Sequence, residues 1–63
     1  MKQQTIKEYI TEAIDFYTRH AEYERMRAEQ ATNGSKIQAE LMMASKFNEG
    51  RASAYEEMLE RIG

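Results

Sequence analysis

One turn signal stands near the middle of this 63-residue chain, at Ala31-Thr32-Asn33-Gly34-Ser35, and helical patterns of similar length lie on either side of it. Glycine readily takes the left-handed conformation that ends a helix, so Asn33-Gly34 predicts a helix C-terminus. Ser35 and Gln38 have the spacing of a capping box, which predicts the start of the next helix. The sequence therefore predicts an all-α fold, an antiparallel hairpin of two long helices.

Capping and periodicity set the bounds that we expect for the two helices. Thr5 and Glu8 form a second capping box. The first helix is therefore predicted at about 6–32, the turn at 33–35 and the second helix at about 36–62, within a single domain 1–63. Gly50 lies inside the second helix, where glycine costs about 1 kcal/mol relative to alanine. Either the helix breaks there or it continues with a close backbone approach, and the unbroken apolar phase across Gly50 favours continuity.

Each helix has an apolar sector that is wider than one neighbour can cover. At 100° per residue each sector spans about 180°, whereas a helix that packs against one neighbour needs little more than about 100°. Folding at the turn is expected to bring Ile6 near Ile62. The apolar positions are Ile6, Tyr9, Ile10, Ala13, Ile14, Phe16, Tyr17, Ala21 and Tyr23 in the first helix, and Ile37, Leu41, Met43, Ala44, Phe47, Ala54, Tyr55, Met58, Leu59 and Ile62 in the second.

The excess apolar width predicts that the hairpin associates with a copy of itself into a four-helix bundle. Chains this short often need disulfides, a metal or oligomerisation, and the absence of cysteine excludes disulfides and thiolate metal sites. Within the hairpin seam, Phe16 is expected to face Arg51, and His20 is expected to face Phe47. The expected assembly is a homodimer. The predicted self-association interface is Ile10, Ile14, Phe16, Tyr17, Phe47, Arg51, Tyr55 and Met58.

Four polar residues interrupt the apolar sectors: His20, Glu24 and Arg27 in the first helix and Arg51 in the second. Long charged side chains are rarely buried unless they are paired. In one hypothesis Glu24 of one chain meets Arg51 of another in an antiparallel dimer. In the alternative these side chains lie at the bundle edge with their stems buried and their charges in water. His20 and Glu24 also have the i,i+4 spacing of metal ligands, but two ligands are too few for a zinc site, so we expect no metal and no cofactor.

No catalytic motif is present, and we expect that the protein is not an enzyme. The chain has one histidine, His20, and no serine near an acid in a context that would activate it. A chain of this length is also too short to enclose a pocket of the usual ligand size. No catalytic or cofactor-binding residue is therefore predicted.

The function that the sequence favours is a small homo-oligomeric protein-interaction module, an adaptor or inhibitor of a larger protein partner. Its size suits a phage or mobile-element accessory protein. The predicted partner surface is Tyr23, Met26 and Met42, because methionine makes adaptable contacts and tyrosine is common at interfaces. The alternative is that these methionines are scattered surface residues without a partner.

A nucleic-acid-binding helical bundle is the alternative function. Its possible phosphate contacts are Arg19, Arg25 and Arg27 on the first helix. The net charge of −2 weighs against it, because nucleic-acid binders usually carry a basic surplus. Length and architecture resemble the Rop-type hairpin dimers, which bind paired RNA loops; no motif is shared, so this resemblance is of shape alone.

The expected location is the cytoplasm. The N-terminus, Met1-Lys2-Gln3-Gln4-Thr5, lacks the apolar run of a signal peptide. No apolar stretch approaches the roughly 20 residues that cross a bilayer, so no membrane partner is expected.

Overall fold

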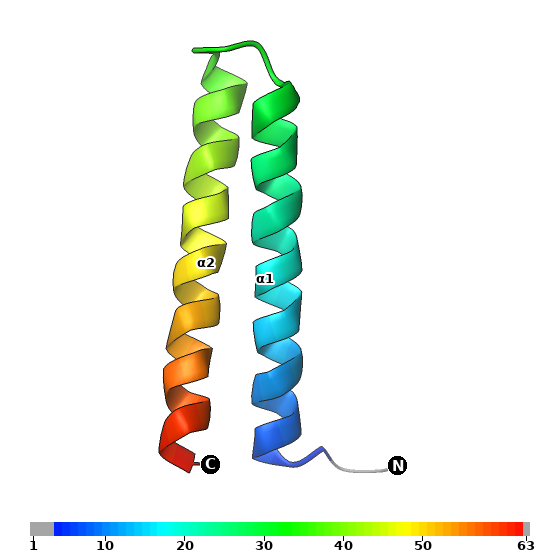
Figure 1. Ribbon diagram of the computed structural model, residues 1–63, viewed down its shortest axis with the longest axis vertical. Coiled ribbons are helices and arrows are strands. Elements are labelled where there is room, and N and C mark those ends of the chain that lie inside the picture. The colour runs from blue at the N-terminus through cyan, green and yellow to red at the C-terminus, as the bar shows by residue number, and fades with distance from the viewer. Residues whose placement is uncertain (1–3, 63) are drawn as a thin grey trace.

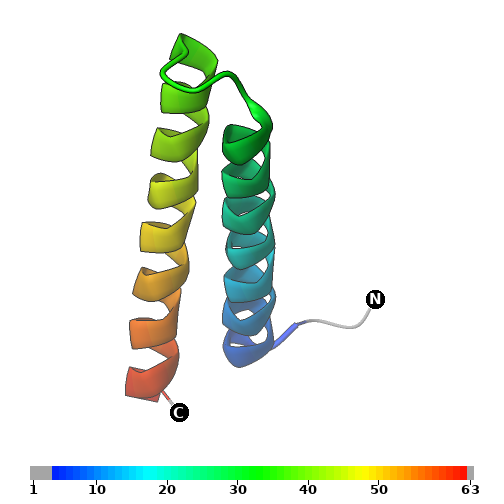
Figure 2. The ribbon, with the colours of Figure 1, turned by 45° about the horizontal axis from the view of Figure 1, so that its top comes forward.

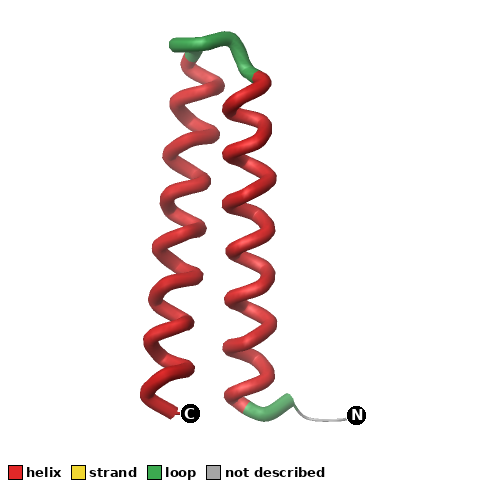
Figure 3. Tube along the Cα trace, in the orientation of Figure 1, coloured by secondary structure: helices red, strands yellow, loops and turns green. Residues whose placement is uncertain are grey.

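The computed structural model describes residues 4–62 and shows two antiparallel helices joined by one turn (Figure 1). Helix α1 spans Ile6–Gln30 and α2 spans Lys36–Ile62, and the described chain is otherwise loop (Figure 3). This confirms the all-α class and the helical hairpin. Residues 1–3 and 63 of the expected domain lie outside the described residues. Neither helix has a stretch apolar and long enough to cross a bilayer within the described residues.

Thr5 and Ser35 cap the helix starts as predicted, although neither Glu8 nor Gln38 makes the return bond of a capping box within the described residues, and α1 ends two residues earlier than predicted. The Glu8 N–H donates to Thr5 Oγ1 at 3.1 Å, and the Gln38 N–H donates to Ser35 Oγ at 3.1 Å. The chain leaves α1 at Ala31, whose backbone is extended. Gly34 therefore does not cap α1; its φ of +79° reverses the chain inside the connecting turn.

The side chain of Gln38 ties the turn to both helices. Its Oε1 accepts from the Gly34 N–H at 2.8 Å, and its Nε2 donates to the Ala28 carbonyl at 3.1 Å. The Ala28 carbonyl belongs to the last turn of α1, where backbone acceptors have no helical partner. The Ala31 N–H also reaches the Ala28 carbonyl, at 3.3 Å. The Gln38 amide thus connects the end of α1 to the turn and to α2.

The seam between α1 and α2 is built from small residues. The buried residues are Ile10, Ala21, Ala28, Ser45 and Ala52, and no large side chain among the described residues is fully buried. Ser45 Oγ donates to the Ala21 carbonyl at 2.8 Å, which satisfies the buried hydroxyl across the seam. Small side chains allow the two helix backbones to approach closely. The hairpin therefore buries little apolar surface of its own.

The register along the hairpin is the predicted one. Ser45 bonds to Ala21, and Gln38 bonds to Ala28, so the levels of the two helices match in antiparallel order. Continuing this register toward the open end brings Ile6 level with Ile62, where the two helices end side by side (Figure 1).

The prediction of which side chains fill the seam is wrong, although the predicted antiparallel register is right. Phe16 is 54% exposed and Phe47 is 59% exposed, so the pairs Phe16–Arg51 and His20–Phe47 do not form the hairpin core. The seam of α2 instead follows its polar positions Ser45 and Asn48. Ser45 lies outside the apolar sector read from the sequence, whereas Asn48 lies within it. Their burial is possible because each makes a hydrogen bond to α1.

Gly50 does not break α2, which is continuous from Lys36 to Ile62 as predicted. The expected close backbone approach is wrong for the hairpin, because a Cβ placed on Gly50 would meet nothing within 4 Å. The glycine is exposed, so its cost to the helix has no compensating contact within the chain.

We expect the substitution Gly50→Ala to raise the free energy of unfolding by about 1 kcal/mol, because alanine is the better helix former and has open space there. Urea unfolding followed by circular dichroism at a fixed chain concentration measures the change. Gly34→Ala is the matched control. It should lower the stability by about 1 kcal/mol, since Gly34 has a left-handed backbone. A stability that fell with Gly50→Ala would mean that the glycine is in close contact after all.

Candidate interaction face

Eight large apolar side chains lie exposed along one side of the hairpin, and we call this surface the apolar face. Their steps of three, four and seven residues, or sums of these, place each set on one side of its helix. Each is about half exposed or more. The apolar face consists of Ile6, Tyr9, Phe16 and Tyr23 from α1 and Ile37, Phe47, Met58 and Ile62 from α2.

Arg51 joins the two halves of the apolar face near the middle of the hairpin. Its Nη1 donates to the Tyr17 hydroxyl at 3.0 Å, across from α2 to α1. Its guanidinium carbon lies 5.4 Å from the centre of the Tyr17 ring and 4.7 Å from the centre of the Phe47 ring. A cation–π contact at an exposed site contributes about 0.5–1 kcal/mol. Arg51 is therefore held in place on the surface before any partner binds.

Aromatic rings extend this cluster over α1. Phe16 meets Tyr17 edge-on at a centroid distance of 5.2 Å, and its ring lies 4.2 Å from the His20 ring. On the other side Tyr17 stacks on Tyr55 of α2 at 5.8 Å. The exposed centre of the apolar face is thus a continuous surface of aromatic rings and one guanidinium, contributed by both helices.

Tyr9 belongs to the same surface and interacts with Tyr55. The pKa of Tyr55 is raised above its ordinary value, chiefly because a negative charge on Tyr9 would repel the tyrosinate. Burial and a side-chain hydrogen bond with Tyr9 also raise the pKa of Tyr55, and Arg51 opposes the shift. These contributions couple Tyr9 of α1 to Tyr55 of α2 across the hairpin.

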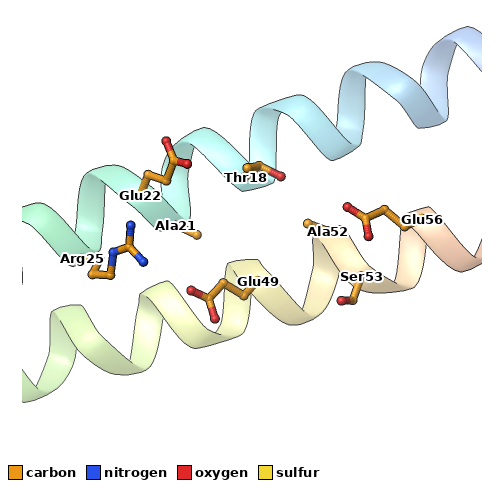
Figure 4. Close-up of a pocket in the computed structure, with 8 residues that line it drawn as sticks. All are labelled: Thr18, Ala21, Glu22, Arg25, Glu49, Ala52, Ser53 and Glu56. Carbon is orange, nitrogen blue, oxygen red and sulfur yellow. The ribbon is translucent and has the colours of Figure 1, made fainter.

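The opposite side of the hairpin has a different chemistry. A shallow groove there is lined by polar and charged side chains, shown in Figure 4, and we call it the polar groove. Its floor is formed by Ala21 and Ala52 of the seam. The residues around it are Thr18, Glu22 and Arg25 from α1 and Glu49, Ser53 and Glu56 from α2.

The structure divides the predicted self-association residues between the seam and the apolar face. Ile10 is buried inside the hairpin, and its neighbour Ile14 is half-buried. Tyr17 and Tyr55 are half-buried where the seam opens onto the apolar face. The exposed members, available to a second molecule, are Phe16, Phe47, Arg51 and Met58.

The predicted partner surface is not one patch. Tyr23 lies on the apolar face, with the guanidinium of Arg27 5.8 Å from its ring centre. Met42 is one heptad from Glu49 and therefore lies on the side of the polar groove. Met26 is one heptad from Arg19, on the outer side of α1. All three are exposed, but Met42 lies on a different side of the hairpin from Tyr23 and Met26, which are one helical turn apart on α1.

The three arginines of the alternative function are also separated. Arg19 pairs with Asp15 at 3.2 Å on the outer side of α1. Arg25 stands at the polar groove among glutamates, and Arg27 covers Tyr23. The structure therefore does not bring these residues into one basic surface.

The polar residues of the apolar sectors find partners within the chain. Glu24 is half-buried in the seam, where its carboxylate accepts a hydrogen bond from Asn48 Nδ2. His20 packs on Phe16. No group of three His, Cys, Asp or Glu side chains among residues 4–62 is placed to hold a metal ion.

Two residues with structural roles were missed from the sequence, Ser45 and Asn48, and the bond from Gln38 to α1 was also not predicted. Each of these residues is polar, so a search for apolar periodicity passes over it. A signal for them exists, because positions 38, 41, 45, 48, 52, 55 and 59 repeat at steps of three and four. A search at that spacing that admits small and polar residues beside the large apolar ones would have located the true seam.

No protein-family model, curated protein or solved structure shows a significant match to this chain.

The Tyr9–Tyr55 pair predicts a pH effect. We expect Tyr9→Phe to lower the pKa of Tyr55 toward its ordinary value, because the charge that repels the Tyr55 phenolate is removed. Since the folded pKa is raised, the pair's contribution to stability is present below about pH 10 and is lost as pH rises through the folded pKa. NMR titration of the protein with ¹³C-labelled tyrosine measures the pKa of Tyr55. Tyr23→Phe is the control, and an unchanged pKa in Tyr9→Phe would contradict the pairing.

Proposed function

We propose that this protein is a homodimeric helical bundle that acts as a small protein-interaction module. In this proposal two hairpins pack apolar face to apolar face into a four-helix bundle. The observation that carries it is the contrast between a seam of alanine and serine and an exposed surface of large apolar side chains. The residues that could form a substantial core are on the outside of the single hairpin.

The shape of the hairpin supports this assembly. A stable domain needs two packed layers of secondary structure around one core. The described chain is a single layer of two helices, also when it is turned by 45° (Figure 2), and its shortest dimension is 12 Å. One side of that layer is polar, so the apolar face is where a second layer would pack.

The surface area supports it as well. The accessible surface of the chain is 5405 Å², whereas a compact monomer of 7.4 kDa exposes about 4200 Å². A dimer interface of standard size removes about 800 Å² from each partner. The excess surface of the hairpin, roughly 1200 Å² by the same scaling, is enough to supply such an interface.

The composition of the apolar face also fits an interface. Binding energy concentrates in tyrosine, tryptophan and arginine side chains near the centre of an interface. The Arg51–Tyr17–Phe47 cluster has that composition and lies near the middle of both helices. Because the cluster is already ordered in the single chain, association loses less side-chain entropy there.

In this proposal the outer surface of the bundle binds the larger protein partner. Dimerisation through the apolar face leaves the polar groove of each hairpin exposed, together with Met26 and Met42. A larger protein partner would therefore contact surfaces that are mixed in charge and carry adaptable methionines. The separation of Arg19, Arg25 and Arg27 favours this role over nucleic-acid binding.

We expect the thermal midpoint of the protein to rise with chain concentration, because folding is linked to association. Phe47→Asp should abolish the dimer at micromolar concentration, since it buries an unpaired carboxylate in the interface. Sedimentation equilibrium and thermal circular dichroism measure both effects. Met42→Asp is the matched control, because Met42 is also a large exposed apolar residue of α2 but lies on the other side of the hairpin.

Two outcomes would refute the dimer. One is a wild-type protein that sediments as a folded monomer with a midpoint independent of concentration. The other is a Phe47→Asp protein that stays dimeric and helical while Met42→Asp dissociates.

Salt dependence separates the protein-interaction role from the alternative. Nucleic-acid binding weakens steeply with added salt through counterion release. We expect capture of a partner from a lysate to survive nuclease treatment and 0.5 M salt, and to be lost with the double variant Met26→Asp, Met42→Asp. Recovery of nucleic acid alone would instead establish the alternative function.

A further inference from the structure

The proposed dimer can be built in two symmetric ways, and charge distinguishes them. If the two turns lie at the same end of the bundle, α1 of one copy packs on α2 of the other. If the turns lie at opposite ends, α1 packs on α1 and α2 on α2. Both arrangements give four helices whose neighbours are antiparallel. The following inference rests on the proposed dimer and concerns which arrangement forms.

Arg27 and Glu40 are the residues that make the difference. They lie at the same level of the hairpin, next to the hydrogen bond between Gln38 and the Ala28 carbonyl. Arg27 covers Tyr23 and, with Ile37, lines a shallow groove near the turn. Glu40 is one heptad before Phe47, so it lies on the same side of α2 as that ring. Both residues are exposed on the side of the apolar face.

Neither residue has an ion-pair partner within the hairpin. Between residues 4 and 62, the one ion pair closer than 4 Å joins Arg19 to Asp15. The charges of Arg27 and Glu40 are therefore available to a second molecule that packs on this side.

With the turns at the same end, equal levels of α1 and α2 meet across the interface. Arg27 of each copy then faces Glu40 of the other, which gives two opposite-charge pairs per dimer. The same register places Tyr23 against Ala44, a large ring against a small residue. Phe16 comes to lie against Arg51, which adds an aromatic face to a guanidinium that already stacks on two rings.

With the turns at opposite ends, like charges meet instead. Arg51 lies close to the midpoint of α2, so full overlap of the facing α2 helices brings the two copies of Arg51 within roughly 6 Å along the bundle axis. With the turns at the same end the two copies are level with each other, but they lie on diagonal helices and each faces Phe16 of the other copy. Glu40 faces the level of Met58, where no cation is available on the apolar face, and Arg27 faces Tyr9. Like charges packed close together in an interface cost several kcal/mol.

We propose that the partner that covers the apolar face is a second copy of this chain, with both turns at the same end of the bundle and reciprocal Arg27–Glu40 pairs between the copies. The two pairs flank the aromatic cluster on its turn side. They set the orientation of the copies, while the apolar face supplies the buried area.

Distance measurement between spin labels tests the orientation. The chain has no cysteine, so Asn33→Cys places one label in each turn of the dimer. With the turns at the same end, we expect a separation between the labels of roughly 15–35 Å, since neighbouring helix axes are about 8–10 Å apart. With the turns at opposite ends, the separation exceeds about 40 Å, the length of the helices. Thr18→Cys is the control, because its mid-length position gives a short separation in both arrangements.

A charge-exchange cycle tests the pairs themselves. Arg27→Glu and Glu40→Arg should each raise the dimer Kd roughly tenfold, because each replaces two attractive pairs by two repulsive ones. The double variant restores the attraction with the signs exchanged, so its Kd should return to within about threefold of the wild type. Arg25→Glu, which makes the same change in net charge at the polar groove, should change the Kd less than twofold.

The outcomes separate this inference from the proposed function. Close labels at Asn33→Cys and recovery in the double variant support the same-end dimer. A dimer with labels more than 40 Å apart, or with additive effects in the double variant, overturns the orientation and leaves the homodimer standing. A monomeric wild-type protein overturns the homodimer itself.

Discussion

The close approach of two helices over alanine and serine determines the rest of this structure. Ala21 and Ala28 of α1 meet Ser45 and Ala52 of α2, and the Ser45 hydroxyl bonds to the α1 backbone. Ile10 is the one large side chain among the described residues that is buried with them, and Leu41 and Leu59 are half-buried. Both phenylalanines lie to one side, together with Ile6, Ile37 and Ile62, and form much of the apolar face. The small seam and the exposed apolar surface are two results of the same packing.

The sequence predicted the hairpin well because its evidence was local. The capping residues Thr5 and Ser35, the turn at Gly34 and the continuity of α2 across Gly50 all follow from nearest-neighbour chemistry. The antiparallel register was also predicted, since it follows from a turn near the midpoint of the chain. The predicted end of α1 is two residues too far along the chain, because Gly34 lies in the connecting turn and does not cap the helix.

The seam could not be predicted by following apolar residues. Ser45 and Asn48 are polar, and their burial depends on hydrogen bonds to a helix far away in sequence. The sequence predicted Phe16 and Phe47 both in the hairpin seam and in the self-association interface, because apolar periodicity does not tell which neighbour covers a side chain. It also predicted that Phe16 faces Arg51 in the seam, whereas both residues are exposed and each contacts Tyr17 near the middle of the hairpin. It could not show which sides of the two helices face each other.

The polar bonds across the seam also decide how the two helices can slide. Gln38, Ser45 and Asn48 each reach an acceptor on α1 at one particular level. A shift of α2 by one heptad would keep small and apolar residues in the seam, yet it would separate the half-buried Asn48 amide from the Glu24 carboxylate, at a cost of about 1–3 kcal/mol for the unsatisfied group. An all-alanine seam would pack in either position with similar energy. The hydrogen bonds of these three side chains therefore favour one alignment of the two helices. The polar residues in the seam in turn bury less apolar surface than apolar residues would.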